Sequence, residues 1–396
     1  MSIAPVESPA RASSAVAAGS HDRIRLESIA IQDFRNLERV NLNFPAEGVA
    51  LIGDNGHGKT NLLEAIYYLQ ILRSIRDARD QDLTRFDATG FHIAAKAHSP
   101  TTHEIGVGFE RASKKKRVTV NGLVPRRMSD ALGKLPSVMF SPRDLELVSG
   151  APSERRRYLD LMLALTDRKY LNALQHYRAN LARRNAALRN ATRRGANDSE
   201  VSVWEPALAE HGSVLIETRA KWVNDRVREF TRISEEIGEK GPAQMRYICA
   251  FAESEARRDV LLAALEEKRS LDMRRGITSV GPHRDDLELT LGGRDLRLFG
   301  SAGQQRTAAI ALRMLEAATL RDHAGAEPLL LLDDPFAELD IHRAARILLM
   351  LEKRGLGQTI LAVPREADIP PGLMQLNSLS VRDGVVTEMN SRIKKF

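Results

Sequence analysis

The stretch from Gly53 to Ile66 reads GDNGHGKTNLLEAI, and its residue types are those that hold a nucleotide phosphate. It matches the pattern G-x-x-x-x-G-K-[ST], in which glycines let backbone N–H groups close around phosphate oxygens. Lys59 supplies a positive charge for the β- and γ-phosphates, and the Thr60 hydroxyl is a ligand for Mg²⁺. We therefore predict that a nucleoside triphosphate and Mg²⁺ bind to this loop through Gly53, Asn55, Gly56, Gly58, Lys59, Thr60 and Asn61.

The residues on either side of this loop are typical of a strand before it and a helix after it. Residues 49–52 are all apolar, while Leu62, Leu63, Ile66 and Leu69 recur at helical spacing. This order places a helix N-terminus, with its partial positive charge, beneath the bound anion. A glycine-rich turn with a chance lysine is the alternative, and the flanking pattern disfavours it.

Two acidic residues far along the chain form the second half of the predicted site, in the run LLLLDDPFAELD that begins at Leu329. Four consecutive leucines are typical of a strand buried on both faces of a parallel sheet. A carboxylate at the end of such a strand is costly unless a cation meets it, so we predict that Asp333 binds the Mg²⁺ held by Thr60. Asp334 then lies where it can orient the attacking water. The alternative is that both acids cap a following helix.

A second helix start lies upstream, in the segment GSAGQQRTAAIALRMLEAA. Ser301, Gly303 and Gln304 precede apolar residues at helical spacing, so this helix start can also face a phosphate. Two helix starts of one chain cannot easily reach the same γ-phosphate, whereas two copies placed head to tail can each supply one. The sequence therefore predicts a dimer with nucleotide sandwiched between its copies.

Composition predicts a globular protein of two or three domains, because 43% of its 396 residues are apolar. The single cysteine, Cys249, excludes a disulfide framework and fits a reducing compartment. We expect a cytoplasmic protein with no membrane partner, since no run of eighteen apolar residues occurs and the N-terminus lacks the pattern of a signal peptide.

The pattern of apolar and polar residues along the chain predicts four segments. Short alternating runs predict two strands and a turn in residues 24–44 and further strands in 91–124, with a hairpin signal at Asn121-Gly122. Residues 152–268 have a helical pattern, and Asp383-Gly384 predicts a closing hairpin. The predicted segments are a disordered leader (1–22), an N-terminal ATPase part with the phosphate loop and a β-hairpin (23–150), a helical lobe (151–275) and a C-terminal ATPase part (276–396).

Basic residues gather in two clusters, and a net charge of +7 favours an acidic polymer as partner. Few aromatic residues lie near either cluster, so duplex or junction DNA is a better fit than a base-stacking groove for single strands. Ordinary solvated faces are the alternative. His283 and Arg284 either contact nucleotide or tie two lobes together. The predicted DNA contacts are Lys114, Lys115, Lys116, Arg117, Arg126, Arg127, Arg183 and Arg184.

The sequence resembles the RecF family of recombination and repair proteins, which belongs to the ABC-type ATPase heads. The resemblance implies an α/β fold, a P-loop ATPase head with a mixed sheet and an inserted, mostly helical lobe. With 273 positions between Thr60 and Asp333, that lobe is too short for a long coiled coil. The stretches that carry the resemblance are DFRNL at 33–37, GDNGHGKTNLLEAIYYL at 53–69, FSPRDLELVSGAPSERRRYLD at 140–160, GPHRDDLELTLGG through GSAGQQRTAAIAL at 281–312, and LLLDDPFAELD at 330–340.

By this resemblance the cofactors are ATP and Mg²⁺, and the catalytic residues are Lys59, Asp334 and Ser301, the last acting across an ATP-dependent homodimer. Gly303 and Gln304 accompany Ser301, and Asp340 falls on the loop that follows the metal carboxylates. The strand at 359–363 runs into Pro364 where relatives place a threonine or histidine switch, so hydrolysis is expected to be slow.

The implied function is DNA repair, replication and the SOS response to damage. It comprises ATP-dependent binding to gapped DNA and single-strand/double-strand junctions, and recombinase loading with RecR- and RecO-type mediator proteins. Two other functions stay open at this stage. One is a dimerisation switch whose hydrolysis is vestigial, and the other is a transporter-type ATPase subunit.

Overall fold

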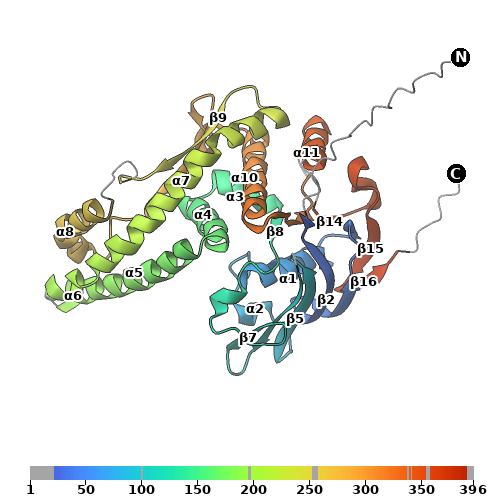
Figure 1. Cartoon of the computed structure of the whole chain (residues 1–396), viewed down its shortest axis with the longest axis horizontal. Helices are drawn as coiled ribbons and strands as arrows, with labels where there is room; N and C mark the ends of the chain where they lie inside the picture. The colour runs from blue at the N-terminus through green and yellow to red at the C-terminus, as the bar shows by residue number, and fades with distance from the viewer. Residues whose placement is uncertain are drawn as a thin grey trace, which may run out of the picture.

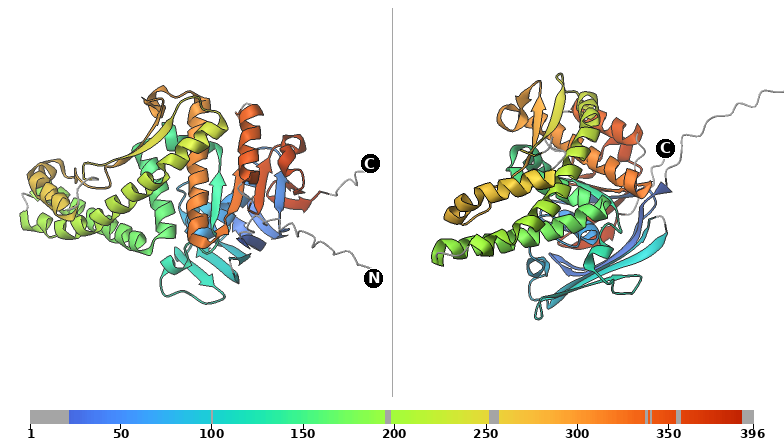
Figure 2. Two further views of the ribbon diagram at one scale, coloured as in Figure 1. Left: turned by 45° about the horizontal axis from the view of Figure 1, so that its top comes forward. Right: turned by 60° about the vertical axis from the view of Figure 1, so that its left-hand side comes forward.

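The computed structural model describes residues 22–99, 101–194, 198–251, 257–336, 339, 341–353 and 357–389. The predicted leader therefore lies almost entirely outside the described residues. Two sheets and a helical lobe make up the described part (Figures 1 and 2), and it contains no helix that is both long and apolar enough to cross a membrane.

A six-stranded sheet in the order β16-β15-β4-β14-β13-β8 carries the strands that end at the predicted site. All neighbours pair in parallel except β15 and β16, which are antiparallel. The four leucines of β13 are at most 4% exposed, which confirms a strand buried on both faces. The strands are β4 (Gly48–Ile52), β8 (Ser137–Phe140), β13 (Leu329–Asp333), β14 (Thr359–Val363), β15 (Asn377–Arg382) and β16 (Val385–Glu388).

A five-stranded antiparallel sheet in the order β3-β2-β5-β6-β7 faces the first sheet across α1 (Lys59–Ile71). Because α1 contacts strands of both sheets, it is apolar on nearly every side rather than amphipathic. The predicted pair of strands in residues 24–44 is confirmed. The strands of this sheet are β2 (Arg25–Phe34), β3 (Leu37–Asn43), β5 (Gly90–His98), β6 (Thr102–Glu110) and β7 (Lys115–Val120).

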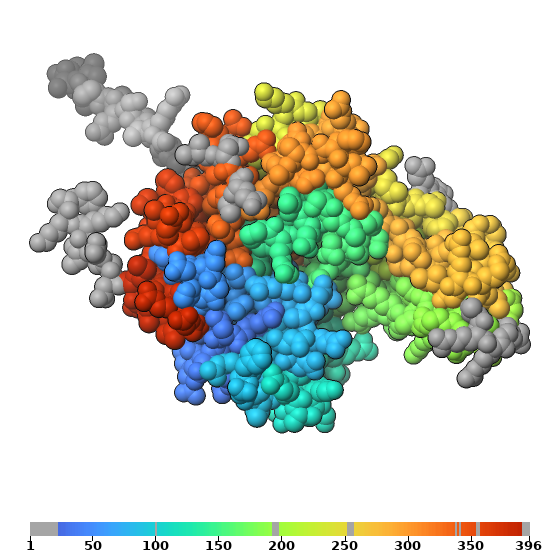
Figure 3. Space-filling model, turned by 180° about the vertical axis from the view of Figure 1, so that it is seen from behind, coloured from blue at the N-terminus to red at the C-terminus, as the bar shows by residue number. Residues whose placement is uncertain are grey.

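The predicted helical lobe is confirmed, and its long helices α5 and α7 project away from the two sheets (Figure 1). The predicted boundary at 275 is wrong, because β9 pairs with β10 across it in the three-stranded sheet β11-β10-β9. From behind, a green segment lies between the blue N-terminal part and the orange C-terminal part in the middle of the molecule, while red C-terminal residues adjoin the blue part directly (Figure 3). The lobe contains α4 (Pro152–Thr166), α5 (Arg168–Arg194), α6 (Asp198–Ser202), α7 (Glu205–Ile237), β9 (Ala243–Ile248), α8 (Arg257–Arg275), β10 (Asp286–Leu291) and β11 (Arg294–Asp295).

Shorter elements and two further helices join these parts. The helix α10 packs against β8, α4 and α7 and so ties the lobe to the six-stranded sheet. These elements are β1 (Asp22–Arg23), α2 (Asp80–Leu83), η1 (Met128–Ala131), η2 (Pro142–Leu145), α3 (Glu146–Ser149), α9 (Leu296–Phe299), α10 (Ala302–Ala324), β12 (Ala326–Glu327), α11 (Ile341–Lys353), η3 (Glu366–Asp368) and η4 (Pro371–Leu373).

The two predicted hairpin signals differ in outcome. Asp383 and Gly384 take φ values of 49° and 80° and close the β15–β16 hairpin as expected. Asn121 and Gly122 also have positive φ, 52° and 76°, but only an isolated bridge between Val120 and Leu123 follows. The predicted turn at Asn121-Gly122 is therefore present, but no second strand follows it, because the chain next forms the 3-10 helix η1.

Inside the lobe, Arg184 is completely buried and lies between two carboxylates. Its guanidinium donates to Glu205 at 2.9 Å and to Asp272 at 2.7 Å. The prediction that Arg184 contacts DNA is therefore wrong, because no part of the side chain reaches the surface. His283 is also a structural residue of the lobe. Burial lowers its pKa to about 4, and its ring contacts the Tyr177 hydroxyl at 2.7 Å.

We expect Arg184→Ala to destabilise the lobe by about 3–5 kcal/mol, because it leaves the Asp272 carboxylate buried without its cation, whereas Glu205 keeps Arg269. The two tryptophans of the chain, Trp204 and Trp222, both belong to this lobe, so their fluorescence during urea unfolding reports on it. Arg189→Ala, at an exposed position of the same helix, is the matched control and should cost well under 1 kcal/mol. Equal unfolding midpoints for the two variants would contradict a structural role for Arg184.

Candidate nucleotide site

The phosphate loop links the end of β4 to the start of α1 and has the backbone that its glycines predict. Gly56 and Gly58 have φ values of 86° and 113°, which L side chains rarely adopt. A Cβ on Gly58 would also lie 2.9 Å from Oδ1 of Asn36. Residues 53–58 therefore form an open loop of backbone N–H groups at the N-terminus of a thirteen-residue helix.

Two turns from distant parts of the chain support this loop. The Asn36 side chain, in the turn between β2 and β3, accepts a hydrogen bond at 2.8 Å from Asn61. In the β15–β16 turn, the N–H of Gly384 donates to the His57 carbonyl at 2.9 Å, and the N–H of Asp383 donates to His57 Nδ1 at 3.0 Å. The sequence predicted both turns but gave no sign that they contact the loop, since more than 300 positions separate His57 from Asp383.

Lys59 points back into the loop, where its ammonium donates to the carbonyls of Gly53 and, at 2.9 Å, of Asp54. Burial lowers the pKa of Lys59, and the nearby carboxylates of Asp333, Asp334 and Asp54 oppose that effect. The structure thus places both predicted acids within electrostatic reach of the predicted phosphate-binding lysine. Such a lysine, held by carbonyls in a buried site, is positioned to exchange them for phosphate oxygens.

Thr60 and Asp333 meet as predicted, although 273 positions separate them. The Thr60 hydroxyl donates to Oδ1 of Asp333 at 3.0 Å. Burial raises the pKa of Asp333, which the Thr60 hydrogen bond and the charges of Arg76 and Lys59 partly offset. A carboxylate in this position is stabilised by any further cation that reaches it.

These residues fit Mg²⁺. The ion usually takes one or two carboxylates and completes its shell with water and substrate phosphates. The described residues include no group of three or more His, Cys, Asp or Glu that could hold a metal by themselves. A metal at this site would therefore be held by Thr60, Asp333 and the nucleotide together.

Asp334 has a left-handed backbone, with φ of 47°, and its N–H donates to the carbonyl of Ala362 on β14 at 2.9 Å. A non-glycine residue in this conformation is strained by roughly 1–3 kcal/mol, and such strain gathers at functional sites. The turn ends β13 abruptly, so Asp333 and Asp334 follow one another at the edge of the sheet beside the phosphate loop.

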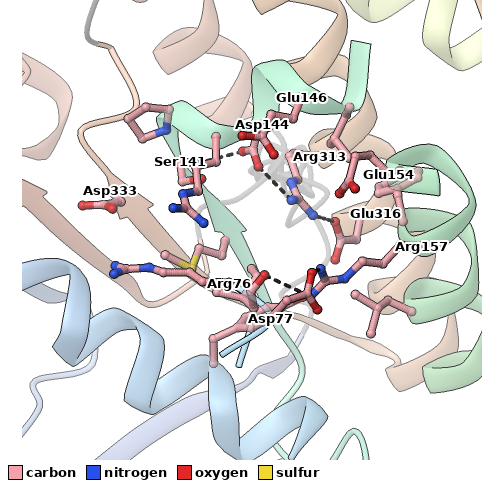
Figure 4. Close-up of a pocket in the computed structure, with 18 of the residues that line it drawn as sticks. Arg76, Asp77, Ser141, Asp144, Glu146, Glu154, Arg157, Arg313, Glu316 and Asp333 are labelled. Carbon is pink, nitrogen blue, oxygen red and sulfur yellow. Dashed lines mark hydrogen bonds and ion pairs between the residues drawn. The ribbon is translucent and has the colours of Figure 1, made fainter. Parts of the chain in front are cut away.

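A cavity of about 410 Å³ adjoins Thr60 and Asp333 and lies between α1, the segment from β8 to α3, and helix α4 of the helical lobe (Figure 4). Arg76, which follows α1, reaches into it beside Asp333. On the opposite wall Arg313 of α10 joins Asp144 at 2.7 Å and Glu316 at 2.6 Å. Arg76 was not among the residues predicted from the sequence, where the only signal for it is a basic residue soon after the predicted helix.

Ser301 caps α10 and lies at the surface, and it shares no hydrogen-bond partner with Lys59 or Thr60. Its hydroxyl accepts from the N–H of Gln304 at 3.3 Å, and the Gln304 side chain accepts from the N–H of Ser301 at 2.9 Å. Leu298 and Phe299, directly before it, are 71% and 69% exposed. Gly303 lies in the first turn of the same helix, next to Arg343. Asp340 lies outside the described residues.

The predicted DNA contacts on β7 lie on opposite faces of the strand, and only one face is free. Lys114, Lys115 and Arg117 are exposed, as are Arg126 and Arg127 beyond the strand. Lys116 is not available, because it pairs with Asp80 at 2.8 Å and donates to the carbonyl of Leu72 at 2.7 Å. That prediction is wrong, since alternate residues of a strand face opposite sides. Arg183 is exposed over the Trp204 ring.

The model of the RecF/RecN/SMC N terminal domain matches residues 25–369. The Smc head domain of Pyrococcus furiosus, solved with an extended coiled coil and bound to the C-terminal domain of ScpA, has the same fold. It superposes with a TM-score of 0.53 at 18% identity, over 92% of this chain and 96% of that chain. Fold and site together define an ABC-type ATPase head of the kind found in SMC proteins.

Closer relatives share a single name, DNA replication and repair protein RecF. That of Exiguobacterium sp. is 34% identical over 337 residues, 82% of this chain and 89% of the relative. That of Herpetosiphon aurantiacus is 34% identical over 381 residues, 90% of this chain and 97% of the relative. A solved structure of the recombination mediator protein RecF with ATPrS, in the RecFOR pathway, has a TM-score of 0.85 at 31% identity, over 93% of this chain and 99% of that chain. The chain belongs to the RecF family.

We expect Asp333→Asn to separate stability from ligand binding. Because the folded pKa lies above the ordinary 3.8, the charged carboxyl costs the ligand-free protein stability as the pH rises through that interval. The variant should therefore melt higher than wild type at neutral pH without ligand. It should lose the gain from Mg²⁺ and ATP, which for wild type is ~2.7 kcal/mol at a hundredfold excess over Kd.

Thermal unfolding with and without Mg²⁺ and ATP measures both effects. Asp54→Asn is the matched control, because Asp54 is an exposed carboxylate of the same loop and should leave the ligand-induced gain intact. An Asp333→Asn protein that gained as much from Mg²⁺ and ATP as wild type would show that Asp333 is not a metal ligand.

Proposed function

We propose that this protein is an ATP-dependent DNA-binding protein that acts as a homodimer, with ATP and Mg²⁺ held between two copies. The observation that carries the proposal is the meeting of Lys59, Thr60 and Asp333 at one end of the sheet, while the second predicted phosphate-facing helix start lies at the surface. Each nucleotide would then be enclosed by the loop of one copy and Ser301 of the other.

Exposed apolar surface beside Ser301 supports a partner on this face. Leu298 and Phe299 belong to the four-residue helix α9 that ends just before Ser301, and together they form an apolar pair next to a helix N-terminus. Large apolar residues at the centre of an interface are typical anchors, whereas solvent gives them no stabilisation. A two-fold arrangement buries both copies of this surface at once.

In the proposed hydrolysis, Lys59 binds the β- and γ-phosphates and Ser301 of the second copy donates to the γ-phosphate. Mg²⁺, held by Thr60 and Asp333, would neutralise charge on the transferred phosphoryl group. Asp334 orients the attacking water and accepts its proton. Turnover is expected to be slow, because β14 ends at Val363 and is followed by Pro364, which has no side chain able to donate to a phosphate.

DNA recognition is proposed to rest on phosphate contacts from Lys114, Lys115, Arg117, Arg126 and Arg127, with Arg183 on the lobe. Such contacts are largely independent of sequence and weaken as salt increases. The expected substrates are gapped DNA and single-strand/double-strand junctions. The proposed role is cytoplasmic and consists of recombinase loading with RecR- and RecO-type mediators. It is supported by one relative's description as a recombination mediator protein of the RecFOR pathway.

A dimerisation switch with vestigial hydrolysis is the second candidate, favoured by the proline after β14. The two candidates differ in steady-state ATP turnover, which DNA should stimulate in the first and leave near background in the second. Because the chain belongs to the RecF family, it is not a transporter-type ATPase subunit.

The shared site predicts complementation between two inactive chains. Lys59→Ala and Ser301→Arg should each abolish turnover alone. A mixed dimer has one intact site, formed by the loop of the Ser301→Arg chain and the serine of the Lys59→Ala chain. With random mixing, half of the dimers carry one working site of two, so about a quarter of wild-type turnover should return.

ATP-dependent dimer formation by the mixture, followed by light scattering, is the control for assembly. Dimers that form without any recovered turnover have two explanations: hydrolysis that requires both sites to be whole, or a Ser301 that acts within its own chain. The absence of both dimers and turnover in wild type, despite ATP binding, would contradict the sandwich.

A further inference from the structure

The segment after β7 exposes apolar side chains in a strongly basic setting. Within six positions, Leu123 is 75%, Val124 58% and Met128 48% exposed. Single exposed apolar residues are ordinary on protein surfaces, but three so close together indicate a binding surface. In Figure 1 β7 lies at the lower edge of the molecule, and the turquoise segment that follows it protrudes in the left view of Figure 2.

This exposure is built into the backbone. Val120 and Leu123 exchange two backbone hydrogen bonds, at 2.9 and 3.1 Å, around the left-handed pair Asn121-Gly122. The Asn121 side chain accepts at 2.9 Å from the N–H of Glu104 on β6. The turn is therefore fixed to the sheet, and Leu123 cannot fold back onto the core without breaking these bonds.

The other end of the segment is equally well anchored, at the start of the lobe. Arg168, the first residue of α5, donates to the Ser129 carbonyl at 2.9 Å and to the Asp130 carboxylate at 2.6 Å. Asp130 also accepts from the N–H of Arg127 at 3.2 Å, and Ala131 is fully buried. Residues 121–128 thus form a rigid projection held between the five-stranded sheet and α5, here called the apolar projection.

Charge around the apolar projection identifies the class of partner. Residues 111–129 include no acidic residue, and Asp130, which follows, is engaged by Arg168. Within the described part of the chain, the side chains of Lys114, Lys115, Arg117 and Arg126 form no ion pair. A polyanion matches this surface better than a protein or a neutral ligand. The basic residues of this stretch are Arg111, Lys114, Lys115, Lys116, Arg117, Arg126 and Arg127.

We propose that the apolar projection is a wedge that inserts Leu123 and Val124 against the last base pair of a single-strand/double-strand junction, while the surrounding cations hold the phosphates. Rigid apolar side chains between basic contacts can unstack base steps, and the cost is least where a duplex already ends. The wedge would provide selection for junctions that phosphate contacts alone cannot give, because phosphates are the same in a continuous duplex and at a gap.

The proposal rests on the proposed DNA binding and adds the residues that choose the DNA structure. Its test uses the full-length protein with ATP, a gapped duplex carrying 2-aminopurine at the junction, and a continuous duplex with the same label. Leu123→Ala with Val124→Ala should lose the fluorescence increase at the junction and bind it about tenfold more weakly, since the apolar contact of both side chains with the last base pair is lost. Affinity for continuous duplex, and the dependence of binding on salt, should stay unchanged because no charge is removed.

Two matched variants complete the design. Arg126→Ala with Arg127→Ala should weaken binding to both DNAs and reduce the salt slope by roughly two, one for each phosphate contact. Val203→Ala removes an exposed apolar side chain of the helical lobe and should change nothing. Unchanged ATP binding by every variant shows that the site and the fold are intact.

The outcomes distinguish a failure of the wedge from a failure of the proposed DNA binding on which it rests. Wild-type protein that binds neither DNA in the presence of ATP overturns the proposed function and the wedge together. Wild-type binding without a junction signal, or a Leu123→Ala, Val124→Ala protein that keeps its junction preference, overturns the wedge alone. The wedge is also overturned if that variant binds DNA normally but loses a mediator protein, since the apolar projection would then be a protein-docking surface.

Discussion

The nucleotide site depends on one partly buried carboxylate. Asp333 ends the all-leucine strand β13 and accepts a hydrogen bond from Thr60, at the first turn of α1. Its burial disfavours the charged form, which the Thr60 hydroxyl and the charges of Arg76 and Lys59 offset only in part. The neighbouring parallel strands place this carboxylate beside the phosphate loop, and the turns at Asn36 and Asp383-Gly384 fix the loop against it. The Asp333 charge therefore lowers the stability of the ligand-free protein, and bound Mg²⁺ and nucleotide would restore that stability.

The remaining architecture separates the two halves of the proposed composite site. One half lies where β4 and β13 end, and the other, Ser301, lies on α10, which connects the helical lobe to β8. The cavity beside Thr60 and Asp333 is lined by the ATPase part of the chain and by α4 of the helical lobe, with Arg313 joined to Asp144 and Glu316 across it from Arg76 (Figure 4). A change in the position of the helical lobe relative to the ATPase part must therefore alter the surroundings of the Asp333 carboxylate. This arrangement provides a physical route by which nucleotide could influence the lobe, α5 and the segment anchored to its first residue.

Sequence reasoning succeeded where chemistry is local and failed where it depends on long-range contacts. The phosphate loop, the buried strand before Asp333 and the β15–β16 hairpin each have a short pattern with one physical cause. Lys116 and Arg184 show the limit, because a basic run gives no information on which side chains turn inward. One is held by Asp80 beneath the sheet and the other by Glu205 and Asp272 inside the lobe. Arg76 and the supports of His57 were missed for the same reason, since contacts between distant segments leave no periodic signal.

The central claim, that each nucleotide is enclosed by two copies of the chain, is tested most directly by crosslinking the loop of one copy to the signature helix of the other. Asp54→Cys chains would be mixed with Ser301→Cys chains, both with Cys249→Ala so that no native thiol reacts, and treated with a short thiol crosslinker. The account predicts a crosslinked heterodimer with Mg²⁺ and ATP, none with ADP, and none when both chains also carry Lys59→Ala. Crosslinking within a single chain that carries both cysteines, at dilutions where no dimer forms, would contradict it.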